Sequence, residues 1–320
     1  MTRYLARNAW TLGLGLLLAL LFVVTKLIQP GFGASGLESL ARAAVPFAFA
    51  TAAMAIVVIA GGIDLSVAAV MAVASVSAAV LMERFPDLGL AILPIAVLIG
   101  AAMGALNGAM VVLTRLPDIV VTLAMLFVWE GVALLVLKAP GGAAYPWLME
   151  MLTGPLLVPL LPQAVVVVAL CLLPFWWIMA RTRLGLSIRA IGSDPVAAFR
   201  SGVPIGQTRI AAYGLAGCLA GLGGLSLTLS TGIGEPIPGP YLLAAVAAVV
   251  LGGVALSGGK GGLIGPIVAV VILRLVRLML VLLAVDPNVT AIVEGTIMVA
   301  VVMFGGFVAL RGAAGRGAAA

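Results

Sequence analysis

Long apolar runs recur along almost the whole chain, and they restrict its fold more than any other feature. Each run is about 20 residues long, the length of helix that crosses the hydrocarbon core of a bilayer. The mean hydropathy is +1.30 and only 9% of the residues are charged, so a water-soluble fold is excluded. Backbone groups in hydrocarbon must form hydrogen bonds within their own segment, and no alternating pattern suggests a barrel. The sequence therefore predicts an all-α polytopic membrane protein with a single transmembrane domain over residues 1–320.

Breaks at proline, glycine and charged residues divide the chain into ten predicted spans. We expect these spans at residues 8–28, 43–60, 64–82, 89–113, 118–138, 159–180, 209–231, 240–257, 262–284 and 289–310. Glycines at close-packing spacing predict tight contact between helices, because a missing side chain lets two backbones approach. The clearest cases are Gly100, Gly104 and Gly108, and Gly217 and Gly221.

Basic residues set the predicted orientation. With the amino terminus in the cytoplasm, eleven of the 17 basic residues lie in inside segments. They are Arg3, Arg7, Arg115, Arg181, Arg183, Arg189, Arg200, Arg209, Lys260, Arg311 and Arg316. The positive-inside rule then places both termini in the cytoplasm. Because the basic residues lie mostly beside membrane spans, the net charge of +6 reflects topology, and no nucleic-acid partner is expected.

Residue types for hydrolytic or metal chemistry are scarce. The chain has no histidine, and Cys171 and Cys218 lie inside apolar spans without metal-ligand spacing. The segment 257–260 resembles part of a phosphate-binding loop, but Val254 and Gly261 stand where the full pattern needs glycine and a hydroxyl residue. We therefore expect a chain that is not an enzyme and has no catalytic residue, metal site or cofactor of its own.

A polar island at residues 181–209 interrupts the apolar sequence and carries five of the basic residues. Within it, Ser193 or Asp194 can cap a helix that begins at Pro195. Gly202 can end this helix after about two turns. Its small, flat surface would comprise Ala197, Ala198 and Phe199. Such a surface suits a cleft on a cytoplasmic partner, whereas the simpler interpretation is an ordinary surface helix.

The segment Gly-Gly-Ile-Asp-Leu-Ser at residues 61–66 breaks an apolar stretch too long for one bilayer crossing. Asp64 and Ser66 can cap the helix that follows. The alternative interpretation is that Asp64 lines a gate.

Charged residues also occur inside predicted spans. Arg274 and Arg277 are three residues apart and share a helix face. A charge near mid-bilayer costs about 2.5–3.5 kcal/mol even on the lenient insertion scale, so these side chains need partners or water. We predict that Glu130 or Glu294 pairs with them. The alternative is that both arginines lie shallower and extend to the interface.

Four separated motifs together resemble those of a known family. They are GGIDLSV at 61–67, NG at 107–108 followed by LPDIVVTLA at 116–124, TRLGLSIRAIG at 182–192, and LLAAVAAVVLGGVALSGGKGGLIG at 242–265. The chain resembles the membrane (permease) subunit of the ribose/xylose/arabinose type of ABC sugar importers from about Ala44 to Leu310. Several positions depart from the family pattern, among them Glu130, where relatives commonly carry arginine. Val196 stands where a glutamate is usual, and Ala68 where a glycine is usual.

The resemblance implies a ten-helix ABC importer permease bundle in the bacterial cytoplasmic (inner) membrane, with residues 193–204 as a coupling helix that contacts the ATPase. The implied contact residues are Asp194, Pro195, Ala197, Ala198, Phe199, Arg200 and Gly202. The implied partners are a cytoplasmic ABC ATPase that uses ATP and Mg, a second permease that is identical or paralogous, and an extracytoplasmic sugar-binding protein.

The expected function is to form the path through which a small sugar or polyol is imported. Neutral, hydroxyl-rich ligands need hydrogen-bonding groups along this path. The candidate path or gate residues are Asp64, Ser66, Asn107 and Thr122. The alternatives are a branched-chain amino acid permease of the same superfamily, an ion-coupled secondary transporter that uses acidic residues within the membrane, and a membrane scaffold that transports nothing.

Overall fold

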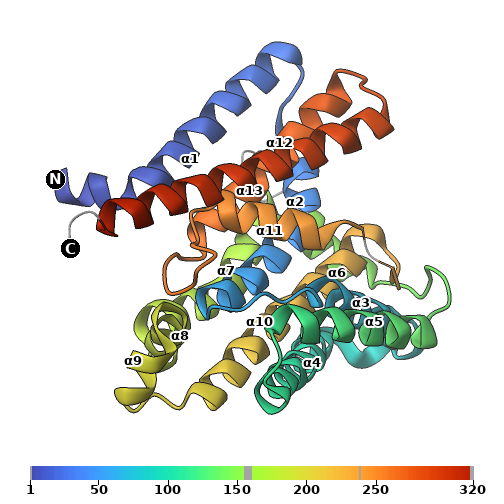
Figure 1. The fold of residues 1–320 in the computed structure, drawn as a ribbon. Helices are drawn as coiled ribbons and strands as arrows, with labels where there is room; N and C mark the ends of the chain where they lie inside the picture. The colour runs from blue at the N-terminus through green and yellow to red at the C-terminus, as the bar shows by residue number, and fades with distance from the viewer. Residues whose placement is uncertain (1, 155–160, 238, 318–320) are drawn as a thin grey trace.

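The structure is a computed structural model that describes residues 2–154, 161–237 and 239–317, with side chains described from residue 10 onward except at 153, 302 and 304–317. Four arginines of the orientation argument, at positions 3, 7, 311 and 316, therefore lie outside the described side chains. The helices are α1 Thr2–Ile28, α2 Ala34–Ile59, α3 Val67–Arg84, η1 Pro86–Ala91, α4 Ile92–Thr114, α5 Asp118–Val136, α6 Pro146–Thr153, α7 Gln163–Arg181, α8 Arg183–Ser193, α9 Pro195–Arg200, α10 Ile205–Thr231, α11 Tyr241–Leu251, α12 Ile264–Leu282 and α13 Pro287–Gly317 (Figure 1).

Eight helices among the described residues are long and apolar enough to cross a membrane. They are α1, α2, α3, the η1–α4 unit, α5, α7, α10 and α12. α11 and the stretch Pro287–Val301 of α13 are shorter apolar helices. The all-α polytopic fold predicted from the apolar runs is confirmed.

The predicted span at 240–257 is wrong, because its helix, α11, ends at Leu251. Eleven residues at about 1.5 Å each give a helix of about 17 Å, roughly half of a hydrocarbon core. Gly252 ends the helix, and Gly253, Gly258, Gly259 and Gly261 adopt positive φ angles that only glycine enters readily. Residues 252–263 therefore form a folded loop that leads into α12.

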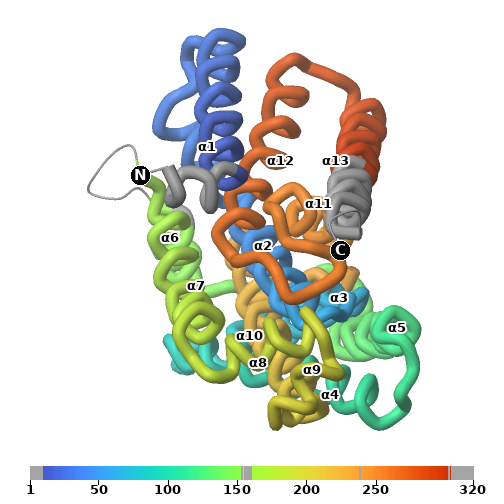
Figure 2. Tube along the Cα trace, turned by 60° about the vertical axis from the view of Figure 1, so that its left-hand side comes forward, coloured from blue at the N-terminus to red at the C-terminus, as the bar shows by residue number. Residues whose placement is uncertain are grey.

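α2 and α10 lie at the centre of the bundle (Figure 2). α2 is buried from Ala44 to Ile59, and α10 is buried from Leu219 to Leu229. α4 packs on α10 through the glycines that the sequence singled out. A Cβ atom added to Gly100 would lie 2.1 Å from the carbonyl oxygen of Gly217, and one added to Gly104 would lie 2.3 Å from that of Tyr213. The predicted close packing is confirmed.

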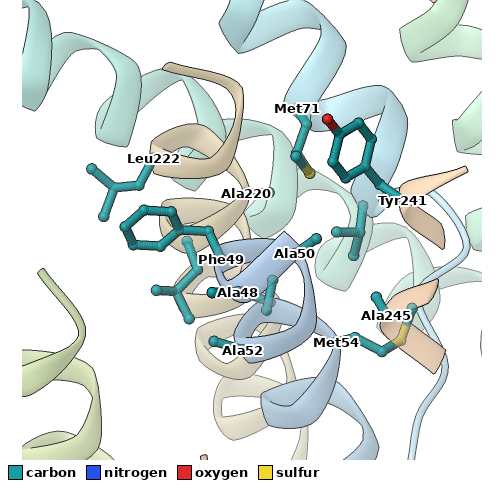
Figure 3. Close-up of a cluster of buried hydrophobic side chains, with 14 of the residues drawn as sticks. Ala48, Phe49, Ala50, Ala52, Met54, Met71, Ala220, Leu222, Tyr241 and Ala245 are labelled. Carbon is teal, nitrogen blue, oxygen red and sulfur yellow. The ribbon is translucent and has the colours of Figure 1, made fainter. Parts of the chain in front are cut away.

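Apolar side chains from four helices fill the space around α2 (Figure 3). Phe49 and Met54 of α2 lie among Met71 of α3, Leu222 of α10 and Tyr241 of α11. Further out, α12 contacts both α1 and α13 and lies between them in Figure 2. The core thus sits around α2, and the outer helices present apolar side chains to the surroundings.

Candidate functional site

The polar island folds into two short helices, α8 and α9, that meet at Asp194. The carboxylate Oδ1 of Asp194 accepts hydrogen bonds from the backbone N–H groups of Val196 at 2.9 Å and Ala197 at 3.0 Å. Asp194, rather than Ser193, is therefore the residue that caps α9. Gly202 follows the helix with a φ of +81°, as a helix-ending glycine does.

The exposed surface of α9 differs from the expected one. Ala198 is buried, so its methyl group packs inward instead of contributing to a flat outer surface. Val196 and Phe199 are the large exposed apolar side chains, at 59% and 70% of their full accessibility, and Ala197 is exposed as expected. α9 has fewer than two full turns, so one face must hold it to the bundle while the other stays accessible. α9 therefore presents Val196 and Phe199 outward.

The end of α8 meets the end of α2 and the 252–263 loop in a contact between backbones, which we call the glycine junction: Gly61, Gly192, Gly258 and Gly259. A Cβ atom on Gly192 would lie 2.0 Å from the carbonyl oxygen of Ile59 and 2.6 Å from the backbone nitrogen of Gly259. A Cβ atom on Gly258 would lie 2.6 Å from the carbonyl oxygen of Gly192. Three segments that are far apart in sequence thus touch where a side chain has no space.

Two hydrogen bonds cross the glycine junction or lie beside it. The Gly259 N–H donates to the carbonyl oxygen of Ile59 at 2.9 Å and so ties the 252–263 loop to the end of α2. Nη1 of Arg189, on α8, donates to the carbonyl oxygen of Gly261 at 2.6 Å. Because α8 leads directly into α9, these contacts connect α9 through α8 to the end of α2 and to the loop before α12.

The four candidate path residues lie together in one buried hydrogen-bond network next to the glycine junction. Ser66 donates to Oδ1 of Asp64 through its backbone N–H at 2.9 Å and through its hydroxyl at 2.5 Å. Nδ2 of Asn107 donates to the Ser66 hydroxyl at 2.7 Å, and Nε1 of Trp129 donates to Oδ1 of Asn107 at 3.0 Å. The network therefore links the 61–66 segment to α4 and α5.

Thr122 joins the same segment from α5. Its hydroxyl accepts from the Leu65 N–H at 3.1 Å and lies 3.1 Å from the carbonyl oxygen of Ile63. The expectation that Asp64 and Ser66 cap α3 is wrong, because no side-chain hydrogen bond caps that helix. Asp64 instead folds the loop before α3 by binding Ser66.

A second acidic group, Asp118, stands at the start of α5. Its Oδ2 accepts a hydrogen bond from the Tyr213 hydroxyl at 2.9 Å, and its Oδ1 lies 3.6 Å from Nη1 of Arg209. A Cβ atom on Gly62 would lie 2.2 Å from Oδ2 of Asp118. Glycine at position 62 thus makes room for the carboxylate that ties α5 to α10.

Sequence reasoning did not single out Asp118, Trp129, Tyr213, Arg189 or Arg209 as members of this site. The one usable signal was Asp118, an acidic residue directly after Pro117 at a helix start and within a recognised motif. Trp129 and Tyr213 looked like ordinary apolar residues of predicted spans. Their partners come from other helices, so no local pattern marks them.

Burial raises the pKa of the Asp64 carboxyl to about 6, although the hydrogen bonds from Ser66 oppose the shift. Asp64 lies in the loop between α2 and α3, outside both spans, and is only 3% exposed. The nearby Asp118 adds a smaller increase by like-charge repulsion. A carboxyl with this pKa changes its charge close to neutral pH.

The charged residues of the predicted spans occupy a separate place. Nη2 of Arg274 lies 3.6 Å from Oε1 of Glu294, and Nη1 of Arg277 lies 3.2 Å from Oε2 of the same residue. Of the two acidic partners considered, the structure thus shows Glu294, on α13. Glu130 lies on α5, and the described salt bridges of both arginines do not involve it.

Within the described part of the chain, no three His, Cys, Asp or Glu side chains are grouped so that they could hold a metal ion. The side chains near the glycine junction bind to one another and to backbone groups. This arrangement can hold the ends of five helices in fixed positions relative to one another, or let them move as a unit. The helices are α2, α4, α5, α8 and α10.

The matches with known proteins all point to transport-system permeases. Residues 36–302 match the family model described as "Branched-chain amino acid transport system / permease component". The chain is 28% identical, over 93% of its length and 92% of the relative's, to the "Autoinducer 2 import system permease protein LsrD" of Escherichia coli (strain K12). The protein of the same name from Shigella flexneri gives the same values. No solved structure matches the chain. The resemblance to ABC sugar importer permeases is confirmed at the level of the family, and the chain belongs to this family of transport-system permease components.

Proposed function

We propose that this chain is the permease subunit of an ATP-driven importer and forms the path for a small sugar or related polyol. The observation that carries the proposal is the glycine junction, where α8 touches the end of α2 and the 252–263 loop without intervening side chains. A force applied to α9 reaches these segments with little loss, because close-packed backbones cannot be compressed. The glycine junction suits a protein whose conformation is changed by a partner that binds α9.

The partner that would supply this force is a cytoplasmic ABC ATPase, which would hydrolyse ATP with Mg. α9 would be its docking element, with Val196 and Phe199 entering a groove on the ATPase. Val196 offers an apolar contact where relatives of this type place a glutamate. The face that carries α9 would lie in the cytoplasm, and both chain termini with it, as the positive-inside count predicts.

Asp64, Ser66, Asn107 and Thr122 would act as a latch that holds the cytoplasmic end of the path closed. All four are buried; Asp64, Ser66 and Asn107 are hydrogen-bonded in series, and Thr122 binds the backbone of the same loop. This is the expected state of a closed gate and not of groups that face a water-filled path. When α9 moves, the 61–66 segment would shift with the end of α2, and this network would have to rearrange. In this proposal, the 61–66 segment couples the ATP-driven motion of α9 to the opening of the gate.

The substrate class rests on the relatives. Their name speaks of autoinducer 2 import, and the family description speaks of branched-chain amino acids. We favour a small hydroxylated molecule, because the GGIDLS motif at residues 61–66 resembles the sugar branch. A branched-chain amino acid such as leucine is the second candidate, supported by the family description.

Reconstitution tests the proposal. The chain is placed in vesicles with its cognate ATPase and with or without the second permease and the binding protein, and uptake of radiolabelled ribose, autoinducer 2 and leucine is measured. Uptake that requires ATP and the ATPase supports the proposed function, and the labelled compound taken up identifies its class. Uptake by the chain alone in an ion gradient would show a secondary transporter instead. A Phe199→Asp variant should lose ATP-dependent uptake, whereas Phe199→Leu, which keeps an apolar side chain at the same exposed position, should retain it.

A further inference from the structure

A second polar feature lies at the other end of the same helices, away from the glycine junction. A cavity of about 530 Å³ opens between the beginning of α2, the end of α10, Glu235, residues 239–241 and the second half of α12. Pockets for small ligands commonly measure about 300–1,000 Å³. Its charged and hydroxyl-bearing lining includes Arg42, Ser230, Thr231, Glu235, Arg274 and Arg277.

Arg274 is the group in this cavity that most needs a ligand. Its side chain is 6% exposed, and its guanidinium carbon lies 3.9 Å from the centre of the Phe47 ring. Its Nη2 is buried and has no hydrogen-bond partner among the described residues, since Oε1 of Glu294 is 3.6 Å away. A buried donor without an acceptor costs about 1–3 kcal/mol, and more when the group is charged. Nη2 itself faces Glu294 and has no exposed surface, so a ligand oxygen in the cavity would reach the guanidinium of Arg274 through its other N–H groups.

The charges around the cavity fix the charge of that ligand. Arg42, Arg274 and Arg277 contribute three positive charges. Glu235 in the lining and Glu294, which pairs with two of the arginines, contribute two negative ones. One positive charge remains uncompensated. A carboxylate with a single negative charge balances it, whereas a phosphate monoester, with about −1.5 to −2 charges, exceeds it.

The other polar groups suit hydroxyls. The Ser230 hydroxyl donates to the carbonyl oxygen of Ser226 at 2.7 Å, and that of Thr231 donates to the carbonyl oxygen of Ile233 at 2.8 Å. With their protons engaged, both oxygens keep lone pairs that can accept from ligand hydroxyls. Glu235 adds carboxylate acceptors at the same wall. Beside them, Tyr241 packs on Phe47 with ring centres 4.2 Å apart and gives the cavity an apolar wall.

We propose that this cavity binds a polyhydroxylated monocarboxylate, a sugar acid. Its carboxylate accepts from the N–H groups of the Arg274 guanidinium that face the cavity, and its hydroxyls bind Ser230, Thr231 and Glu235. The proposal rests on the proposed transport function only for the role of the site, which is to bind a substrate at the end of the bundle opposite α9 before its import. The binding itself is a property of this chain and requires no ATPase.

The test uses the purified full-length chain in detergent and isothermal titration with D-gluconate, D-glucose and propionate at constant ionic strength. Gluconate should bind at least about tenfold more tightly than glucose, which lacks the charge, and than propionate, which lacks the hydroxyls, because each loses a group that the cavity satisfies. The variants are Arg274→Gln combined with Glu294→Gln, which leaves no unpaired buried carboxylate, and Ser230→Ala. The double variant should lose the preference for gluconate over glucose, and Ser230→Ala should reduce the preference for gluconate over propionate.

The matched control is Arg115→Gln, which removes an arginine at the opposite end of the bundle and should bind gluconate as the unchanged chain does. The proposal is overturned if gluconate does not bind, if glucose binds equally well, or if the double variant keeps the preference for gluconate. Where the double variant elutes as an aggregate, Arg274→Lys replaces it; lysine lacks the guanidinium geometry, so an undiminished preference for gluconate in that variant overturns the role of Arg274. Gluconate binding without ATP-dependent uptake would uphold the cavity and refute the transport proposal. ATP-dependent sugar uptake without gluconate binding would do the reverse.

Discussion

Gly192→Ala is the substitution that best tests the glycine junction. Gly192 lies in the last turn of α8, where alanine on its own should stabilise the helix by about 0.5–1 kcal/mol. In the junction, however, the added methyl carbon would lie 2.0 Å from the carbonyl oxygen of Ile59. The sign of the effect therefore depends on whether the junction exists as described.

The magnitude follows from the distances. Ordinary contact begins at 3.4 Å, so the end of α2 or α8 must move by about 1.4 Å. Such a movement breaks or stretches the 2.9 Å hydrogen bond from Gly259 to Ile59, which is worth about 1 kcal/mol. Overpacking adds about 1–3 kcal/mol. With the helix gain subtracted, we expect a net destabilisation of about 1–3 kcal/mol.

Two assays report the outcome. Thermal unfolding of the purified chain in detergent measures the destabilisation, and ATP-dependent uptake per ATP hydrolysed in the reconstituted transporter measures the loss of coupling. The control is Gly262→Ala in the neighbouring loop, where an added Cβ meets no atom within 4 Å. We expect the control to match the unchanged chain in both assays. If Gly192→Ala matches it too, or is more stable, α8 does not press on α2 and the argument for force transmission fails.

Three further changes test other parts of the molecule. Asp194→Ala removes the cap of α9 and should lower its stability by about 0.5–2 kcal/mol and weaken ATPase binding in a pull-down, whereas Asp194→Asn should keep both, since it still accepts the hydrogen bonds. The pKa of Asp64 is raised to about 6, so the stability that its neutral form contributes is fully present below the unfolded pKa of 3.8 and is lost as pH rises through about 6. Unfolding midpoints of the unchanged chain relative to Asp64→Asn should therefore fall between about pH 4 and 6 and level off by about pH 7; a flat difference would contradict the burial of an ionisable Asp64. Gly217→Ala places a Cβ 2.1 Å from the carbonyl oxygen of Gly100 and should destabilise the α4–α10 contact by about 1–3 kcal/mol. Gly214→Ala on the same helix meets only ordinary contacts, so the gain in helix propensity should leave it at least as stable as the unchanged chain in the same unfolding assay.

Much of the candidate site was visible as separate pieces in the sequence. The cap at Asp194, the helix-ending glycine at 202 and the four polar residues Asp64, Ser66, Asn107 and Thr122 were all marked by residue type and local position. Their connection was not. Asn107 binds Ser66 across 41 residues of sequence, and Trp129 enters the network from a third helix. Such pairings depend on how helices pack, which no local pattern specifies.

The same limit explains the errors. α11 looked like a full span because residues 240–257 are apolar, but the glycines from 252 onward turn the chain back against α2 and α8. Ala198 looked like part of an outer surface because a two-turn helix has no periodicity long enough to show which face is buried. Glu294 and Glu130 were equally good partners for the arginines until the positions of α12 and α13 separated them.

The sequence by itself determined that this chain is a bundle of membrane helices with a capped polar segment between two of them, because bilayer thickness, helix caps and charge act within contiguous stretches of chain. Only the tertiary structure decided that α8 rests on α2 through glycine, that the polar residues near position 64 form one network, and that Arg274 lines a cavity. The physical reason is that these features come from backbones and side chains brought within a few ångströms of one another by packing. That proximity joins residues as far apart in the sequence as Ile59 and Gly259.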